Sequence, residues 1–408
     1  MRSRRTSALF GVAVVAVLFA GFALVAVPAF RSISQDRAWE GRAGARKRIA
    51  KAMHEAFPCS RFFVDLNGGA CRAVGRRLCN KRIMCRNGVL CESRSAVPVG
   101  STADGCRHVR WLSRVCKERG IPFVVVVAPA KIDAGREMFP EGWDNGGDLN
   151  AWAHACCEDF KAEGIEVVDL TSRYTATPED VRRNFFRTDH HWKISCAFDA
   201  AHVTANVLSR ILGEPVLRDH PYANSTNWEW RTMKNSFVGS HGRRTGAWFS
   251  GVDDFEYAVP VFETHMARKF FRNGVVWEGS FEDSALTRSR IVENDRERRY
   301  SIVGGGDRSW EECQKTGKDR RMLISNFTAP CDKRIMVSGD SFGVPFAASI
   351  SVLFKEMLVN DPRNMPRGLN EAKVISEYRP DVVVRIVYAM TLKGKRVKGR
   401  ARKAKDER

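Results

Sequence analysis

The sequence contains no Cys-x-x-Cys pair and no internal repeat, and its acidic residues are few: 47, against 67 basic residues in a chain of 408. Without a Cys-x-x-Cys pair, a zinc knuckle is not expected. The shortage of acidic residues leaves a net charge of +20, which favours anionic partners such as polyanionic glycans, lipid headgroups or nucleic acid. Apolar residues make up 44% and charged residues 28%, which is the balance of a folded chain.

Charge is missing altogether from Ser7 to Phe30, and three arginines precede this run. A helix of this length crosses a hydrocarbon core of roughly 30 Å. Because basic residues stay on the cytoplasmic side, we expect a single-pass protein of the cell membrane whose bulk is extracytoplasmic. A cleaved signal peptide is the alternative, since Val27–Ala29 offers small residues, but the apolar run is longer than such peptides usually carry.

The twelve cysteines are interpreted in the light of that location, because disulfides form outside the cytoplasm. Five of them lie between Cys59 and Cys91. We expect disulfides within residues 59–116 and no metal bound by cysteine. Others, such as Cys196 in a helical pattern, are expected to be small core residues.

Beyond residue 100, helical patterns alternate with apolar strand patterns. Helices are expected from Asp104 to Gly120, over 148–163 and 195–212, and from about Pro345 with Ile350, Leu353 and Met357 on one face. A continuous apolar run at 121–130 predicts a strand that is covered on both faces, and apolar stretches at 165–170, 333–340 and 381–388 predict three more strands. This alternation predicts an α/β fold in which a parallel central sheet lies between helical layers.

Composition changes along the chain suggest the domain boundaries. We expect a cytoplasmic stub and signal-anchor helix over 1–30 and a basic, cysteine-containing stalk over 31–84. A catalytic domain is expected over 85–390, with an inserted β-rich lobe at 220–330. The last segment, 391–408, holds nine basic and two acidic residues, which is typical of a disordered tail.

A first motif, Gly339-Asp340-Ser341-Phe342, stands where a predicted strand meets a predicted helix. Ligands of α/β sheets bind at the carboxyl ends of the strands, so a serine at this turn is a candidate nucleophile. Gly339, Asp340 and Phe342 are candidates for supporting the turn and an oxyanion, together with the N–H groups of the following helix. The alternative is an ordinary Asp-Ser helix cap.

A second motif, Arg187-Thr188-Asp189-His190-His191-Trp192, offers the general base that a serine nucleophile needs. Asp189 and His191 are two residues apart, so in extended backbone they project to the same side. His190 would then point away and be structural. A polar loop that caps the next helix and a metal site built on Asp-His-His are the alternatives.

Taken together, the motifs resemble the SGNH-hydrolase superfamily, in particular the branch of the alginate O-acetyltransferases AlgX and AlgJ and the DHHW proteins. In that branch the Asp-x-His-Trp motif precedes the GDSF serine, as it does here. Weaker resemblances lie at 86–90 (RNGVL), 124–135 (VVVVAPAKIDAG) and 237–240 (FVGS). The resemblance implies an SGNH-like three-layer sandwich with Ser341 as nucleophile, His191 as base and Asp189 as the acid that orients it.

The resemblance also implies a function: serine-dependent O-acetylation of a cell-surface or secreted polysaccharide, with no cofactor and no metal. A membrane acyltransferase would be the partner that supplies acetyl groups, and nucleic acid would lie on the wrong side of the membrane. The tryptophans of the insert, Trp228, Trp230, Trp248 and Trp277, are either sugar-stacking residues or core.

Three alternatives remain open at this point. A carbohydrate esterase or deacetylase would use the same three residues. A DHH phosphoesterase would need further Asp-rich motifs, which the sequence does not contain. A non-catalytic, wall-associated binding protein would use the stalk and tail instead.

Overall fold

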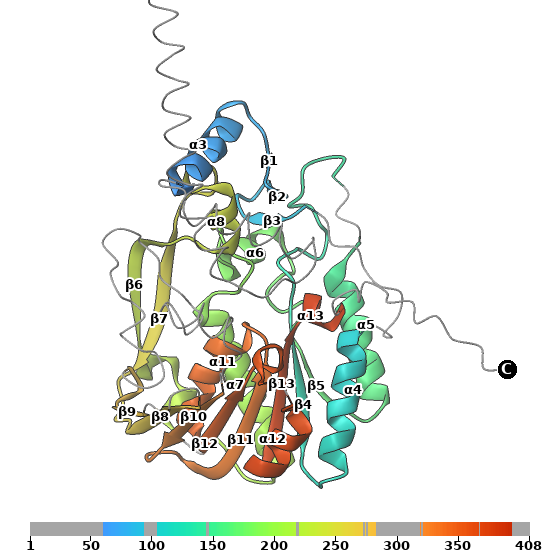
Figure 1. The fold of residues 1–408 in the computed structure, drawn as a ribbon, viewed down its shortest axis with the longest axis vertical. Coiled ribbons are helices and arrows are strands. Elements are labelled where there is room, and N and C mark those ends of the chain that lie inside the picture. Colours follow the sequence, from blue (N-terminus) through green and yellow to red (C-terminus); the bar gives the residue numbers. More distant parts are fainter. Residues whose placement is uncertain are drawn as a thin grey trace, which may run out of the picture.

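The computed structural model describes residues 60–93, 104–143, 147–217, 220–271, 274, 276–282, 319, 321–366 and 368–393 (Figure 1). Its helices are α3 (Ser60–Ala73), α4 (Asp104–Lys117), α5 (Leu149–Ala162), α6 (Pro178–Asn184), α7 (Ile194–Leu212), α8 (Ser240–Thr245), α9 (Ala247–Ser250), α11 (Gly343–Ile350), α12 (Glu371–Tyr378) and α13 (Ala389–Lys393). Its strands are β1 (Leu78–Cys79), β2 (Arg82–Met84), β3 (Leu90–Glu92), β4 (Phe123–Ala128), β5 (Glu166–Asp169), β6 (Trp228–Phe237), β7 (Asp253–Pro260), β8 (Met266–Phe270), β9 (Val276–Gly279), β10 (Met322–Asn326), β11 (Cys331–Gly339), β12 (Phe354–Asn360) and β13 (Val382–Tyr388).

One large mixed sheet organises the chain, with the strand order β5-β4-β13-β11-β12-β10-β8-β9. The first five strands in this order are mutually parallel. Strands β10, β8 and β9 continue the sheet in antiparallel pairing. Each crossover between parallel strands needs a long connection, and the helices provide it. The carboxyl ends of the parallel strands therefore meet at one edge.

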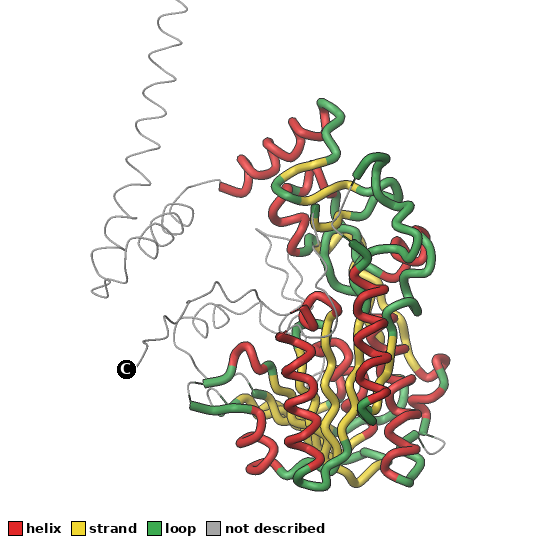
Figure 2. Tube along the Cα trace, turned by 90° about the vertical axis from the view of Figure 1, so that its right-hand side faces the viewer, coloured by secondary structure: helices red, strands yellow, loops and turns green. Residues whose placement is uncertain are grey.

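Helices cover both faces of this sheet. On one face, α4 and α12 pack against Met336, Leu358 and Val383. The neighbouring residues of the same strands turn the other way and join the cluster that holds the buried residues of α7 and α11. In the side view, helices run alongside the strands (Figure 2). The fold is thus α/β and layered, as expected, although the sheet is mixed and not wholly parallel.

The four strands predicted from apolar runs are present as β4, β5, β11 and β13. The helices predicted over 148–163 and 195–212 correspond to α5 and α7, and Gly213 ends α7 in the left-handed conformation. The prediction for the segment after Pro345 is wrong in part, because α11 ends at Ile350 and strand β12 begins at Phe354. Leu353 and Met357 therefore lie beyond the helix. Pairing with β11 and β10 on either side stabilises the strand there.

The segment predicted as an inserted lobe divides between two places. Strands β6 and β7 form a separate two-stranded ribbon, which stands beside the main body in Figure 1. Strands β8, β9 and β10 instead extend the central sheet. The insert is therefore joined to the core by backbone hydrogen bonds along β12.

The amino-terminal part that the structure describes packs on the body. Helix α3 lies against α8 and α9, and β1, β2 and β3 form a small antiparallel sheet. The ten described cysteines are all free thiols, so the disulfides predicted within 59–116 are not present among them. All of these cysteines except Cys71 are buried, Cys196 included, and they fill space as small apolar side chains.

No helix in the described ranges is long and apolar enough to cross a membrane. The predicted anchor, Ser7 to Phe30, lies outside those ranges, as do residues 31–59 of the predicted stalk and 394–408 of the tail.

Candidate active site

Ser341 lies in the turn between β11 and α11, at the carboxyl end of the central sheet. Asp340 holds this turn together. Its Oδ1 accepts from the Phe342 N–H at 3.0 Å, and its Oδ2 accepts from the Tyr388 N–H at 2.8 Å and the Thr391 hydroxyl at 2.6 Å. The serine is thereby fixed to the end of the neighbouring strand β13.

Close packing requires glycine at two positions of this turn, the predicted Gly339 and also Gly343. A Cβ at Gly339 would overlap the side chain of Ile386, and a Cβ at Gly343 would lie 2.6 Å from Ile386 Cγ2. Phe342 is buried and stacks on Tyr388 with ring centroids 4.4 Å apart. The N–H groups of Phe342 and Gly343 both donate to Asp340, so these residues support the turn.

Three side chains form a hydrogen-bonded series across 150 residues of sequence. The Ser341 Oγ lies 2.7 Å from His191 Nε2, and His191 Nδ1 lies 2.5 Å from Asp189 Oδ1. Because a carboxylate only accepts, Nδ1 carries the proton and Nε2 is left to accept from the serine hydroxyl. His191 and Asp189 are buried, and Ser341 is partly exposed. The arrangement has the components of a nucleophile, a base and an orienting acid.

A backbone bridge between its two ends closes the turn that carries Asp189 and His191. Phe185 pairs with Trp192 in an isolated bridge, and Trp192 is fully buried. The turn is also held from outside by Asp253 at the start of β7, whose Oδ2 accepts from the N–H and the hydroxyl of Thr188 at 2.8 and 2.7 Å.

The second oxygen of Asp189 accepts from the Ser240 N–H at the start of α8. A Cβ on Gly239 would overlap Asp189, so only glycine allows this approach. Burial by itself would raise the pKa of Asp189. The charge and hydrogen bond of His191, the charge of His190 and the Ser240 N–H outweigh it and hold the pKa well below its usual range. Asp189 is therefore ionised at neutral pH.

His190 does not point away from the site, as the alternation along the chain suggested. Its ring lies 3.9 Å from that of His191, centroid to centroid, and its Nδ1 lies 2.9 Å from the Ser240 hydroxyl. Burial first, and then the charge of His191, lower the pKa of His190 to about 3. His190 is therefore neutral at physiological pH.

Among the described residues, two groups of side chains have the composition of a metal site. The donor atoms of Asp189, His190 and His191 lie within 4.8 Å of one another. Both ring nitrogens of His191 are engaged, so a metal there would displace the bond to Asp189 or to Ser341. The second group joins His154 and Asp169, 2.6 Å apart, with Glu158, and it is mostly exposed.

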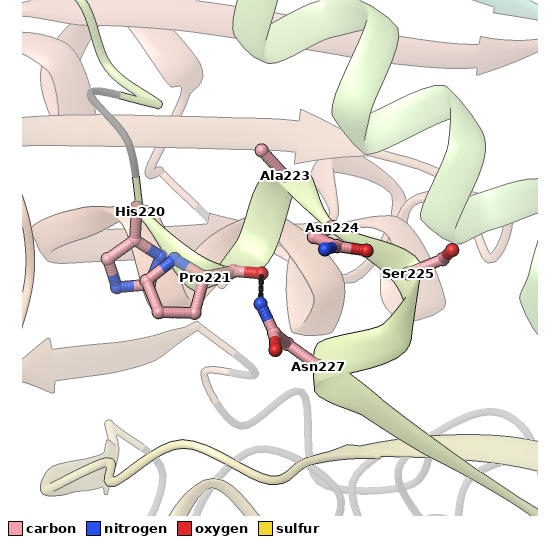
Figure 3. A pocket seen from close by; sticks show the side chains of 6 residues that line it. All are labelled: His220, Pro221, Ala223, Asn224, Ser225 and Asn227. Atoms are coloured by element: carbon pink, nitrogen blue, oxygen red, sulfur yellow. Dashed lines mark hydrogen bonds between the residues drawn. The ribbon is translucent and has the colours of Figure 1, made fainter.

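A surface hollow of about 520 Å³ is lined by His220, Pro221, Ala223, Asn224, Ser225 and Asn227 (Figure 3). Within it the Asn227 side chain donates to the Pro221 carbonyl at 2.9 Å. None of the three aligned side chains of the candidate site contributes to this hollow.

The tryptophans of the insert serve different purposes. Trp228 is buried among aromatic rings and belongs to the core. Trp230 and Trp248 are exposed, by 41% and 53%, and remain available to a ligand. The side chain of Trp277 lies outside the described part.

Three residues that support the site could not be identified from the sequence motifs: Gly239, Ser240 and Asp253. Gly239 and Ser240 belong to the FVGS segment, which was noted only for its resemblance. Asp253 lies in no motif, and nothing in the chain before β7 signals its contact with Thr188.

Acidification is expected to destabilise the protein through His190. Its pKa is about 3 in the folded state and about 6.5 in an unfolded chain, so between these values the unfolded state binds the extra proton. The free energy of unfolding therefore falls as the pH drops through this window. We expect a loss of about 2 kcal/mol between pH 7 and pH 5 from this group, measured by urea denaturation.

The variant His190→Gln provides the comparison, because it removes the titrating group and keeps a polar side chain. Its unfolding free energy should depend less on pH over the same range. His241, whose pKa burial also lowers, still contributes in the variant, and Asp189 contributes only at lower pH. Equal slopes for the two proteins would contradict the assignment.

Comparison with known families places this site in context. Residues 95–233 match the family model of the SGNH hydrolase-like domain of the acetyltransferase AlgX. The match includes Asp189 and His191 and ends before Ser341. A search of curated proteins found no match.

Solved structures share the fold. Bacillus cereus PatB1 with a sulfonyl adduct has a TM-score of 0.54 at 15% identity, over 77% of this chain and 95% of that chain. PatB1 without an adduct in its description has a TM-score of 0.50 at 17% identity, over 72% and 93% of the two chains. A DHHW family protein from Eubacterium siraeum has a TM-score of 0.50 at 16% identity, over 77% and 95%.

The family match confirms the enzyme class expected from the sequence, an SGNH-type O-acetyltransferase or esterase. It also confirms the resemblance seen in the sequence, and it includes the RTDHHW motif at 187–192 but not the GDSF motif at 339–342. Residues 95–233 are therefore similar to the SGNH hydrolase-like domain of the acetyltransferase AlgX.

Proposed function

We propose that this protein is an extracytoplasmic O-acetyltransferase that modifies a cell-surface or secreted polysaccharide through Ser341, His191 and Asp189. One observation carries the proposal: the continuous hydrogen-bonded series from Ser341 Oγ through His191 to Asp189 Oδ1. It lies at the carboxyl edge of the sheet, in a fold shared with proteins of the AlgX type.

Acetylation of the enzyme is the first half of the mechanism. Ser341 Oγ attacks the acetyl carbonyl while its proton passes to His191 Nε2. The ionised Asp189 stabilises the imidazolium that results. The Ser341 N–H is the proposed donor to the oxyanion, since those of Phe342 and Gly343 are engaged by Asp340. Collapse expels the donor's oxygen, which takes the proton from His191, and leaves acetyl-Ser341.

Transfer to the acceptor is the second half. A sugar hydroxyl gives its proton to His191 Nε2 and attacks the acetyl-Ser341 carbonyl. The tetrahedral intermediate collapses to the sugar acetate, and His191 returns the proton to Ser341. Water in place of the sugar would make the same site an esterase or deacetylase, which is the second candidate function.

The location and partners belong to the same proposal. The uncharged run from Ser7 to Phe30 behind three arginines supports a single span with the domain outside. A membrane acyltransferase partner would deliver the acetyl groups. The net charge of +20 and the exposed Trp230 and Trp248 suit a polysaccharide acceptor, since sugars stack on aromatic faces.

Labelling followed by a transfer assay tests the proposal. A fluorophosphonate probe should label the purified full chain at Ser341, and EDTA should leave the turnover of a chromogenic acetyl ester unchanged. With an acetyl ester as donor, added polysaccharide should gain acetyl groups detectable by NMR. Release of acetate alone would favour the esterase, and absence of labelling would favour a binding protein.

A further inference from the structure

Lys131 follows the end of β4 and is 4% exposed. Its Nζ lies 2.5 Å from the carbonyl oxygen of Phe186 and 2.9 Å from those of Leu90, Arg187 and Asp189. These four oxygens form what we call the carbonyl cage. Four acceptors at these distances favour the ammonium form, because it offers three N–H groups, one of them shared between two oxygens, whereas a neutral amine offers only two.

Within the described part of the chain no carboxylate forms an ion pair with Lys131, and its hydrogen-bond partners are all backbone carbonyls. Burial lowers the pKa of Lys131, whereas the nearby charges of Asp253 and Asp189 raise it. Burying a charge costs a large desolvation energy unless dipoles replace the lost water. The cage supplies such dipoles in the way that rings of carbonyls replace the hydration shell of a potassium ion.

The carbonyls of the cage come from β3 and from the turn that carries the candidate acid and base. Leu90 belongs to β3, whereas Phe186, Arg187 and Asp189 lie in succession along the turn that carries the candidate acid and base. The turn thus wraps around the Lys131 ammonium. Removing the cation would leave the Phe186 and Asp189 carbonyls without the donor that the structure gives them. The Arg187 carbonyl would still accept from the Leu90 N–H, and the Leu90 carbonyl would still lie 3.1 Å from His241 Nδ1. The turn would therefore lose the bonds that hold its two ends to one point.

We propose that Lys131 is a positioning residue, an inference that rests on the proposed function. Its ammonium acts as a built-in monovalent cation that fixes the 186–189 turn. By fixing the turn, it also fixes the hydrogen bond between His191 and Ser341. The side chain touches neither the nucleophile nor the base, so it acts through the backbone. Misplacement of a base by about 1 Å costs a serine enzyme about 100-fold in rate.

The test is cation rescue of Lys131→Ala in the full chain. The variant should lose about 100-fold in kcat for a chromogenic acetyl ester, with little change in KM. Ammonium or potassium chloride should raise the kcat of the variant at least about tenfold, and the increase should saturate with salt concentration, because these ions are small enough for the cage. Choline chloride at the same ionic strength should not.

Two further variants sharpen the result. Lys131→Met fills the cage with an uncharged chain of similar length, so it should stay slow in every salt. Lys161→Ala removes an exposed lysine of α5 that pairs with Glu158, and it should behave as the wild type. Wild-type kcat in Lys131→Ala, a folded variant that no cation rescues, or rescue of Lys131→Met would each overturn the proposal.

Melting temperature supplies a readout that does not depend on catalysis. Ammonium should raise the melting temperature of Lys131→Ala and leave that of Lys131→Met unchanged, because an ion that binds the folded state stabilises it. If the wild type fails to turn over any acetyl ester, the proposed function is wrong. The comparison of melting temperatures then still shows whether the carbonyl cage binds a cation. An alanine variant that stays unfolded in every salt would also overturn it.

Discussion

Ser341→Ala and His191→Ala are each expected to lower kcat for a chromogenic acetyl ester by at least about 10⁴-fold. His191 acts by taking the proton of Ser341, so the two residues work as one unit. The double variant should therefore be no slower than either single variant. Steady-state kinetics measure the loss, and fluorophosphonate labelling should disappear in Ser341→Ala.

Matched variants separate this effect from general damage. Ser172→Ala changes an exposed serine and should leave kcat unchanged. His190→Ala removes the neighbouring ring and should cost less than about tenfold, since His190 is not in the proton path. An equal loss from the two histidine variants would reverse the choice of base. Substantial activity in Ser341→Ala would remove the nucleophile assignment.

Asp189→Asn is expected to lower kcat by about 10³- to 10⁴-fold while leaving the fold intact. The carboxylate now accepts from His191 Nδ1–H with one oxygen and from the Ser240 N–H with the other. An amide has one acceptor oxygen. If its NH₂ faces His191, the imidazole takes the tautomer whose Nε2 carries the proton, and Nε2 then no longer accepts from Ser341.

The kinetic measurement needs a carboxylate control and a check on folding. Asp180→Asn alters an acidic residue in the capping box of α6, close in sequence and remote from Ser341, and should retain full kcat. Circular dichroism should show both variants folded. If Asp189→Asn kept more than about a tenth of the wild-type rate, Asp189 would be structural.

Much of the candidate site could be predicted because its parts are local motifs. The Asp-x-His spacing and the strand-to-helix junction at Ser341 are both visible in the sequence. Asp189 and His191 nevertheless lie in a turn and not in extended chain, and the Asp189 side chain also accepts from the His191 N–H. The contacts of Asp253 and Lys131 could not be predicted. Lys131 donates to backbone carbonyls of the 186–189 turn, and Asp253 accepts from two backbone N–H groups and one hydroxyl of that turn. A backbone group leaves no mark in the sequence that would identify its partner.

The fold shows the same division. Strands buried on both faces are rich in apolar residues and could be predicted: β4 is an unbroken apolar run, and β13 is apolar except for Arg385. Strand β12 was missed because Ile350, Leu353 and Met357 are spaced like one face of a helix. Only the pairing of β12 between β11 and β10 distinguishes the two, and that pairing depends on residues far along the chain.

The way the insert joins the sheet limits how the chain can be shortened. Because β10 pairs along β12, and β8 along β10, removing residues 220–330 would strip one side of β12 of its hydrogen-bond partner. A bare inner strand offers unpaired N–H and C=O groups to other chains and promotes aggregation. The insert is thus the natural edge of the protein, and a minimal catalytic domain has to retain it.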